Sequence, residues 1–338
     1  MTERGEDPVA ALRRLVNGFQ VSQAIHVAAV LGIADRIAAG VHDSAALAEA
    51  TGTDPQALYR VLRALAAAGV FAEHDDRRFD LTPIGEHLRS DGQPTLAGWV
   101  SFIGRPYFWE AWGHLLDSVR TGDNAFRLTH GVSPWEYRAA HPDESVIFDR
   151  AMASVTSQVS GAVLAEYDFS RFERVVDVGG GSGAFIAALL AACPTVTGVV
   201  FDQPHVVAVP DPVLQSGELA GRCTILGGDF FDSVPAGADA YVMKAVLHDW
   251  PDAEAIEILM RCRAAGGGSS TAIVVERVLA GPNEGADGKF SDLNMLVGPG
   301  GQERSVAEFA ALFAAAGYEP PRVYPTASPM TVLEAAAI

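Results

Sequence analysis

The residues best suited to chemistry begin with a glycine-rich segment in the middle of the chain. Gly179, Gly181 and Gly183 follow an apolar run that contains Asp177, and they precede the apolar stretch 185–192. Glycines at such a turn let a ligand approach the backbone, and the first residues of a helix offer unpaired N–H donors. The segment therefore predicts a site for a nucleotide-like ligand.

The glycine spacing alone fits two kinds of site. Gly179-x-Gly181-x-Gly183 is typical of the nucleoside-binding turn of methyltransferases, whereas Gly179-x-Gly181-x-x-Ala184 also satisfies the loose dinucleotide fingerprint. Asp202 ends the next apolar run, where a carboxylate can accept hydrogen bonds from the two ribose hydroxyls of an adenosine. Dinucleotide sites also use such an acid, so the choice between the two kinds of site depends on the residues after the later strands.

A second acid separates the two interpretations. Asp229 follows the third apolar run in the segment Gly228-Asp229-Phe230, and it adds a carboxylate beside an aromatic face. Dinucleotide sites do not require this second acid. The pair of acids therefore favours a nucleoside ligand.

Four more polar residues follow the later strands. Lys244 and His248 come after the fourth apolar run, Glu276 ends the fifth, and Glu303 lies in a glycine-rich segment near the C-terminus. In open α/β sheets, ligands bind at the carboxyl ends of the strands. We therefore expect these side chains to share one site with the glycine turn.

The elements that must position these residues are read from hydrophobic periodicity. Short apolar runs alternate with helical stretches in the second half of the chain, which predicts a parallel sheet covered on both faces. A helix is expected at 306–316, and two closely connected strands after it suggest an antiparallel edge. The predicted strands are 174–178, 198–202, 223–226, 240–243, 271–276, 322–324 and 330–334.

The N-terminal half is predicted to be helical, with the outline of a winged helix between residues 41 and 90. Helices are expected at 45–50 and 55–68, followed by two short strands. This segment holds five Arg or Lys against eight Asp or Glu. Because that balance is acidic, we interpret the winged helix as a scaffold and not as a DNA reader.

Taken in order, the motifs resemble those of the S-adenosylmethionine (SAM)-dependent small-molecule O-methyltransferases. This family includes plant caffeic acid and flavonoid enzymes and bacterial enzymes that modify polyketides and phenazines. The resemblance covers nearly the whole chain, and the motifs that carry it are Asp-Val-Gly-Gly-Gly-Ser-Gly (177–183), Phe-Asp-Gln-Pro-His (201–205), Gly-Gly-Asp-Phe-Phe (227–231), Leu-His-Asp-Trp (247–250), Asp-Leu-Asn-Met-Leu (292–296) and Gly-Gly-Gln-Glu-Arg-Ser (300–305).

The resemblance implies a class I methyltransferase fold, an α/β Rossmann-like sheet that is mostly parallel with an antiparallel last strand. It also implies an N-terminal helical and winged-helix dimerisation domain. We expect three regions: 1–100 for dimerisation, 101–170 as a helical linker that contributes to the acceptor pocket, and 171–338 as the SAM-binding catalytic domain. The expected assembly is a homodimer formed through the N-terminal helices.

The resemblance also assigns roles within the site. The cofactor would be SAM, with S-adenosylhomocysteine (SAH) as the product and no metal. The residues that would bind it are Asp177, Gly179, Gly181, Asp202, Gly228, Asp229, Phe230 and Lys244. His248 matches the general base, and Glu276 and Glu303 match the acids that orient it. A phenol has a pKa near about 10, so a neutral His would raise its nucleophilicity near neutral pH.

A largely apolar cluster precedes the sheet and suits a flat aromatic acceptor. The expected substrate residues are Phe102, Phe108, Trp112, Phe148 and Met152, with Asn294 and Met295 from the late segment, and Trp109 lies in the same cluster. The predicted function is methylation of a phenolic or enolic hydroxyl of an aromatic secondary metabolite. Two alternatives stay open: hydroxylase or decarboxylase chemistry on the same fold, and a winged-helix regulator that senses a nucleoside.

Composition excludes several other classes of protein. Lys+Arg 24 against Asp+Glu 42 gives a net charge of −18, which repels nucleic acid and anionic membrane surfaces. No stretch is long and apolar enough for a membrane span, and residues 1–8 do not resemble a secretory signal. The three widely spaced cysteines predict reduced, buried thiols. We therefore expect a cytoplasmic enzyme.

Overall fold

The computed structural model describes residues 7–92 and 94–338, and the chain divides into two units. The first unit ends at Pro106, and the second runs from Tyr107 to Ile338. Each unit has its own apolar core. No helix among the described residues is long and apolar enough to cross a membrane.

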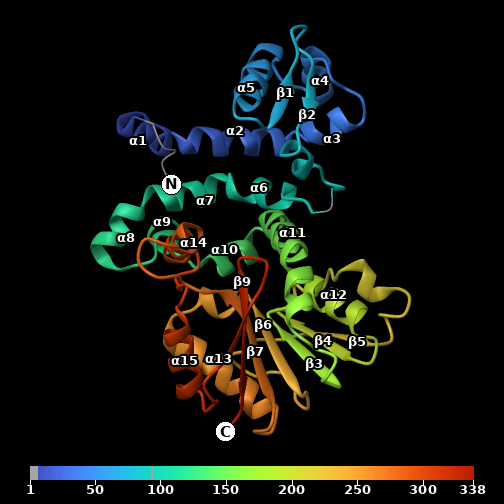
Figure 1. Ribbon diagram of the computed structural model, residues 1–338, viewed down its shortest axis with the longest axis vertical. Helices are drawn as coiled ribbons and strands as arrows, with labels where there is room; N and C mark the ends of the chain where they lie inside the picture. The colour runs from blue at the N-terminus through green and yellow to red at the C-terminus, as the bar shows by residue number, and fades with distance from the viewer. Residues whose placement is uncertain (1–6, 93) are drawn as a thin grey trace. The chain divides into compact units, whose positions relative to one another are not determined.

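The first unit is a set of short helices with a two-stranded wing (Figure 1). Asp43 and Asp54 accept hydrogen bonds from backbone N–H groups at the starts of α4 and α5, as their positions in the sequence predict. The winged-helix prediction is confirmed. The elements are α1 (Pro8–Val16), α2 (Gly18–Val30), α3 (Ile33–Ala38), α4 (Ser44–Thr51), α5 (Pro55–Ala67), β1 (Phe71–Glu73), β2 (Phe79–Leu81), the 3-10 helix η1 (Gly85–Leu88) and α6 (Ala97–Ile103).

The second unit is built on a seven-stranded sheet in the order β5-β4-β3-β6-β7-β9-β8. The first five of these strands are parallel, and β9 pairs antiparallel with both β7 and β8. All seven strands lie where the sequence predicts them; β8 forms the antiparallel edge, and β9 lies between it and β7. Their bounds are β3 (Arg174–Val178), β4 (Thr197–Asp202), β5 (Cys223–Gly227), β6 (Ala240–Lys244), β7 (Thr271–Arg277), β8 (Arg322–Pro325) and β9 (Met330–Ala336).

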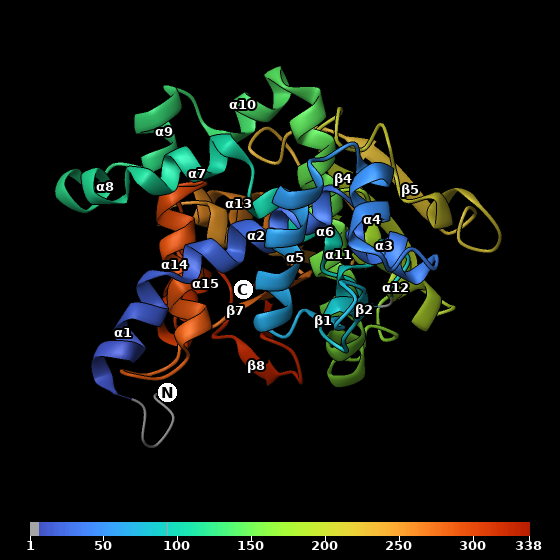
Figure 2. The same ribbon diagram turned by 90° about the horizontal axis from the view of Figure 1, so that it is seen from above.

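Helices cover both faces of this sheet, which explains why its central strands are apolar apart from Arg174, Asp177 and Lys244. Val175 and Val242 pack with α11 and α12 on one face, whereas Val176 and Tyr241 pack with α13 and α15 on the other. Helices α11 and α12 lie side by side in both views (Figures 1 and 2). These covering helices are α11 (Pro142–Glu166), α12 (Ala184–Ala192), α13 (Asp252–Ala265) and α15 (Val306–Ala315).

Shorter helices precede α11 and interrupt the later part of the chain. They are α7 (Pro106–Gly113), α8 (Leu115–Thr121), α9 (Ala125–His130), α10 (Pro134–Ala140), η2 (Pro212–Gln215), η3 (Leu247–Asp249) and α14 (Ala286–Val297). Asn124 joins two of these segments, because its side-chain amide donates to the carbonyls of Leu296 and Gly298 at the C-terminal end of α14. Of the three cysteines, Cys193 and Cys262 are buried as predicted, whereas Cys223 is half-buried.

Candidate active site

The glycine turn connects β3 to α12 and leaves open space at its tip. Gly179, Gly181 and Gly183 have positive φ angles of 70°, 60° and 90°, which other residues rarely adopt. A Cβ atom on Gly179 would lie 2.7 Å from the side chain of Val246, whereas one on Gly181 would meet nothing within 4 Å. The turn therefore presents bare backbone to an open volume at the start of a helix.

Two buried acids lie beside this turn. The Asp202 carboxylate accepts hydrogen bonds from the backbone N–H groups of Gly181, at 2.8 Å, and of Gln203, at 2.6 Å. Asp177 is 1% exposed, and its Oδ2 has no hydrogen-bond partner. Burial raises the pKa of Asp202 and raises that of Asp177 to about 7. Both acids thus keep acceptor capacity that a bound ligand could use.

The turn and the two acids line one cavity, which contains about 1120 Å³ of space including its mouth. Eight residues predicted from the sequence meet here: Asp177, Gly179, Gly181, Asp202, Phe230, Lys244, Phe148 and Met152. Residues that the sequence did not single out complete the wall, among them Trp135, Arg138, Asp149, His205, Asp249 and Trp250.

A more open depression adjoins this cavity and contains the remaining predicted cofactor residues. The two share the wall residues Trp135, Gln203, Phe230, Asp249 and Trp250. Gly228 and Asp229 line the depression, and the Asp229 carboxylate accepts the N–H of Phe231 at 2.9 Å. A Cβ atom on Gly228 would lie 2.5 Å from the ring of Phe201, so only glycine fits.

His248 lies on the short helix η3, which a buried carboxylate holds in place. Glu276, at the end of β7, is fully buried, and its Oε1 accepts the backbone N–H groups of Val246, Leu247 and His248 at 3.0, 2.9 and 3.4 Å. Ala245, just before this turn, has a φ of 55°, which is strained for a residue with a side chain. Glu276 therefore positions the backbone that carries His248.

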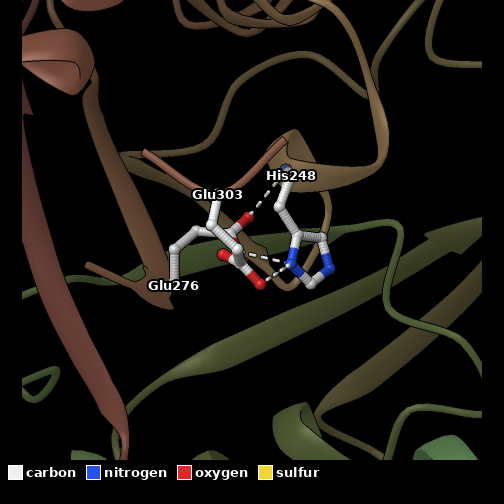
Figure 3. Close-up of side chains that lie close together, drawn as sticks. All are labelled: His248, Glu276 and Glu303. Atoms are coloured by element: carbon white, nitrogen blue, oxygen red, sulfur yellow. Dashed lines mark hydrogen bonds and ion pairs between the residues drawn. The ribbon is translucent and has the colours of Figure 1, made fainter. Parts of the chain in front are cut away.

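The imidazole of His248 faces two carboxylates. Its Nδ1 lies 3.1 Å from Glu303 Oε1 and 3.4 Å from Glu276 Oε2 (Figure 3). Glu303 Oε1 also accepts the Ser291 hydroxyl at 2.7 Å. Figure 3 shows that the other ring nitrogen, Nε2, points away from both glutamates, and it lies 3.7 Å from Asp249 Oδ1. The pairing predicted from the sequence is therefore present.

The charges around His248 differ from the expectation of a neutral imidazole. Burial lowers the pKa of His248, but Glu276, Asp249 and Glu303 raise it by more, to about 10. Burial raises the pKa of Glu276 to about 7 and that of Asp249 to about 6. The resting site is thus an imidazolium held by buried carboxylates. The sequence could not give this result, because it depends on how deeply all four groups are buried.

The donor atoms of His248, Glu276 and Glu303 lie within 4.8 Å of one another, which is close enough for a metal ion. Glu276 Oε1 accepts three N–H groups and His248 Nδ1 faces Glu303, while Glu276 Oε2 and Glu303 Oε2 accept no hydrogen bond. We therefore interpret the group as an ion pair that orients the imidazole.

Two further residues hold the His248 turn, and neither was predicted. Arg304 is fully buried and donates to the carbonyls of Leu247 and Trp250 and to the Asp252 carboxylate. A Cβ atom on Gly301 would lie 2.1 Å from the carbonyl oxygen of His248, so the two backbones pack in direct contact. Both residues lie in the Gly-Gly-Gln-Glu-Arg-Ser motif (300–305), and this motif is the feature of the sequence that could have identified them.

Several predicted substrate residues are not brought to the cavity. Phe108, Trp112, Asn294 and Met295 do not line it, and Phe102 belongs to the first unit. Phe102, Phe108 and Met295 are at least 94% buried, and Phe102 packs against Trp99. Aromatic residues at helical spacing serve packing between helices as readily as a pocket, so their spacing in the sequence does not separate the two roles.

Comparisons with known proteins agree with this geometry. An O-methyltransferase domain matches residues 112–319, and an O-methyltransferase dimerisation domain matches residues 13–91. The chain is 40% identical to a phenazine O-methyltransferase of Lysobacter antibioticus over the whole of both chains. It is 39% identical to a mitomycin biosynthesis 6-O-methyltransferase of Streptomyces lavendulae, over 95% of this chain and 92% of that protein.

A solved structure is similar in fold as well as in sequence. It is an O-methyltransferase from neocarzinostatin biosynthesis in complex with SAM and 2-hydroxy-5-methyl naphthoic acid. The TM-score is 0.81 at 36% identity, and the match covers 94% of this chain and 96% of that one.

Proposed function

Because this chain belongs to the O-methyltransferase family, and is thus a SAM-dependent enzyme, we propose that it methylates a hydroxyl group of an aromatic secondary metabolite with His248 as the general base. The observation that carries the proposal is one continuous site. A bare glycine turn, buried acids and an aromatic wall line the cavity, and the His248 cluster adjoins it through Asp249.

The residues at the strand ends suit this cofactor. In the proposal, Asp202 accepts the ribose hydroxyls, and Asp229 and Phe230 flank the adenine in the adjoining depression. The unpartnered Oδ2 of Asp177 and the open space at Gly181 support this fit. When bound, SAM supplies an electrophilic methyl group on a sulfonium sulfur.

The aromatic wall supports a flat acceptor. Trp135 and Trp250 stack with ring centroids 6.3 Å apart and planes 16° from parallel, and Phe148 meets Trp135 edge-on. Met152 adds an adaptable side chain from the next turn of α11. Such a surface would hold an aromatic ring in one plane and so align the acceptor oxygen with the methyl group. In an in-line displacement, most of the rate gain comes from this alignment.

The His248 cluster would take the hydroxyl proton. In our proposal, Nδ1 stays hydrogen-bonded to Glu303, and Nε2 accepts the proton as the acceptor oxygen attacks. Nε2 can do so only when the imidazole is neutral. The resting imidazolium must therefore first release its Nε2 proton to solvent, while the Nδ1 proton stays between the ring and Glu303.

The N-terminal helices support a homodimer as the working form. Along α1 and α2, apolar side chains lie exposed within the first unit, and this segment overlaps the dimerisation domain. Those exposed by more than 50% are Val9, Leu12, Leu15, Val16, Phe19 and Val30. A monomer mass in light scattering at micromolar concentration would contradict the assembly.

Transfer of labelled methyl groups tests the proposed reaction. The purified chain would be incubated with methyl-labelled SAM and pairs of hydroxyarenes and aminoarenes of the same ring size, and the products identified by mass spectrometry. We expect label on a phenolic oxygen. Transfer only to nitrogen, or hydroxylation or decarboxylation without label, would contradict the proposal. His248→Gln, assayed in parallel, separates transfer assisted by the base from transfer by alignment alone.

A further inference from the structure

The cavity wall contains a buried cation that the proposed reaction does not use. Arg138, on α10, is only 6% exposed, yet it lines the cavity together with Trp135 and Phe148. Its guanidinium carbon lies 3.8 Å from the ring centre of Phe148 and 4.6 Å from that of Trp135. The aromatic faces therefore fix the plane of the guanidinium within the cavity.

Arg138 has no anionic partner within reach. In the part of the chain that the structure describes, no carboxylate lies within 4.0 Å of its guanidinium, and it donates no hydrogen bond to a backbone carbonyl. Burial is the larger effect on the pKa of Arg138 and lowers it. The Tyr107 hydroxyl lies close enough to the guanidinium to partner it and raises this pKa, and the charges of Asp249 and Asp149 act in the same direction.

A second buried arginine shows what Arg138 lacks. Arg304 is fully buried, and it donates to the Asp252 carboxylate and to three backbone carbonyls. A buried guanidinium keeps its charge and needs such partners, because desolvation is otherwise uncompensated. Arg138 has two aromatic faces and the single Tyr107 hydroxyl, so most of its five donors are available to a ligand in the cavity.

We propose that Arg138 binds a carboxylate on the aromatic acceptor, so that the natural substrate is a hydroxyaryl carboxylic acid. The inference rests on the proposed function. A planar guanidinium pairs with a carboxylate through two parallel hydrogen bonds, which fixes orientation as well as affinity. The aromatic partners of Arg138 are the rings assigned to the acceptor, whereas the cofactor is assigned to the strand ends.

Charges nearby would make this contact selective. Asp149 and Asp249 line the same cavity and would repel a carboxylate at any place other than Arg138. A carboxylate held there leaves the rest of the ring against Trp135 and Phe148. The arrangement thus predicts one preferred orientation of the acceptor.

Calorimetry on the SAH-loaded enzyme tests the inference without turnover. The ligands would be 1,4-dihydroxy-2-naphthoic acid and its carboxamide and methyl ester, which differ only in charge at one position. We expect the acid to bind roughly ten- to a hundredfold more tightly than the carboxamide. This preference should disappear in Arg138→Met and persist in part in Arg138→Lys. Arg120→Met, at an exposed position on α8, is the matched control and should keep it.

Each outcome decides the question. Equal affinities for acid and carboxamide, or no binding of either, would overturn the inference. A tenfold or larger loss of SAH affinity in Arg138→Met would also overturn it, because Arg138 would then serve the cofactor. If wild-type enzyme bound no SAH, the proposed function would fail as well, so the two failures are distinguishable.

Discussion

Replacing Glu303 with Gln tests how the buried carboxylates control His248. The substitution keeps the size of the side chain and removes one negative charge 3.1 Å from Nδ1. The pKa of His248 should fall, because one negative charge fewer then stabilises the imidazolium. A general base works in its neutral form, which is populated above its pKa, so the acid limb of the rate profile should move to lower pH.

The size of the shift follows from the structure. Glu276, Asp249 and Glu303 raise the pKa of His248 to about 10 against the opposing effect of burial. Loss of one opposite charge at this distance should lower the pKa by roughly one to two units, or about 1.4–2.7 kcal/mol.

The assay is kcat/KM for the acceptor as a function of pH at saturating SAM. A bound sulfonium cation repels the proton, so the wild-type limb should lie above neutral pH but below the resting value of about 10. In Glu303→Gln the limb should lie at least about one pH unit lower, with a reduced plateau because the imidazole is less well oriented. NMR titration of labelled histidines in the SAH complex reports the same shift without turnover.

Controls separate this effect from others. Glu319→Gln, at an exposed position, should leave the limb in place. If the acid limb of the rate profile persists in His248→Gln, it reports ionisation of the acceptor and not of the enzyme. The reasoning would be refuted if the acid limb of the wild-type rate profile lay near pH 6, stayed in place in Glu303→Gln and vanished in Asp249→Asn. Burial raises the pKa of Asp249 to about 6, so Asp249 would then be the base.

The remaining predictions concern the base, the cofactor and the turn that carries His248. His248→Gln should lower kcat by roughly two to four powers of ten and leave SAM affinity nearly unchanged in calorimetry; unchanged kcat would mean that alignment alone drives transfer. Asp202→Asn should weaken SAH binding roughly ten- to a hundredfold, and equal affinity would exclude it as the ribose acceptor. Gly301→Ala should lower the free energy of unfolding by about 1–3 kcal/mol, because its Cβ would meet the His248 backbone; a Tm equal to wild type in calorimetric scans would contradict that contact.

The fold was largely predictable because local signals agreed with one another. Apolar runs such as 174–178 and 240–243 could only be strands buried on both faces, and Asp43 and Asp54 marked helix starts. The position of β9 between β7 and β8 was not predictable, because the apolar pattern of a strand does not say which strands it pairs with; β9 pairs with seven residues of β7 and four of β8.

The candidate site was predictable where a motif placed each residue at a strand end. Asp202, Glu276 and His248 come from such positions, and the parallel sheet brings them to one edge. The aromatic residues were harder, since Phe108 and Phe148 have similar contexts in the sequence but only Phe148 faces the cavity.

Arg138 and the charge on His248 could not be predicted at all. A lone Arg on a short helix is usually solvated, and only the packing of Trp135 and Phe148 around it shows otherwise. The charge on His248 depends on distances to residues up to 55 positions away in the chain. Both results follow from burial, which a single sequence does not specify.

Calorimetric titration of the purified protein with SAM, SAH and NAD in parallel tests the central claim most directly, because it needs no knowledge of the acceptor. The account predicts micromolar binding of both sulfur nucleosides, weakened in Asp202→Asn, and no binding of NAD. Binding of NAD alone would contradict it, because the glycine turn would then be a dinucleotide site and His248 a candidate for hydride-transfer chemistry.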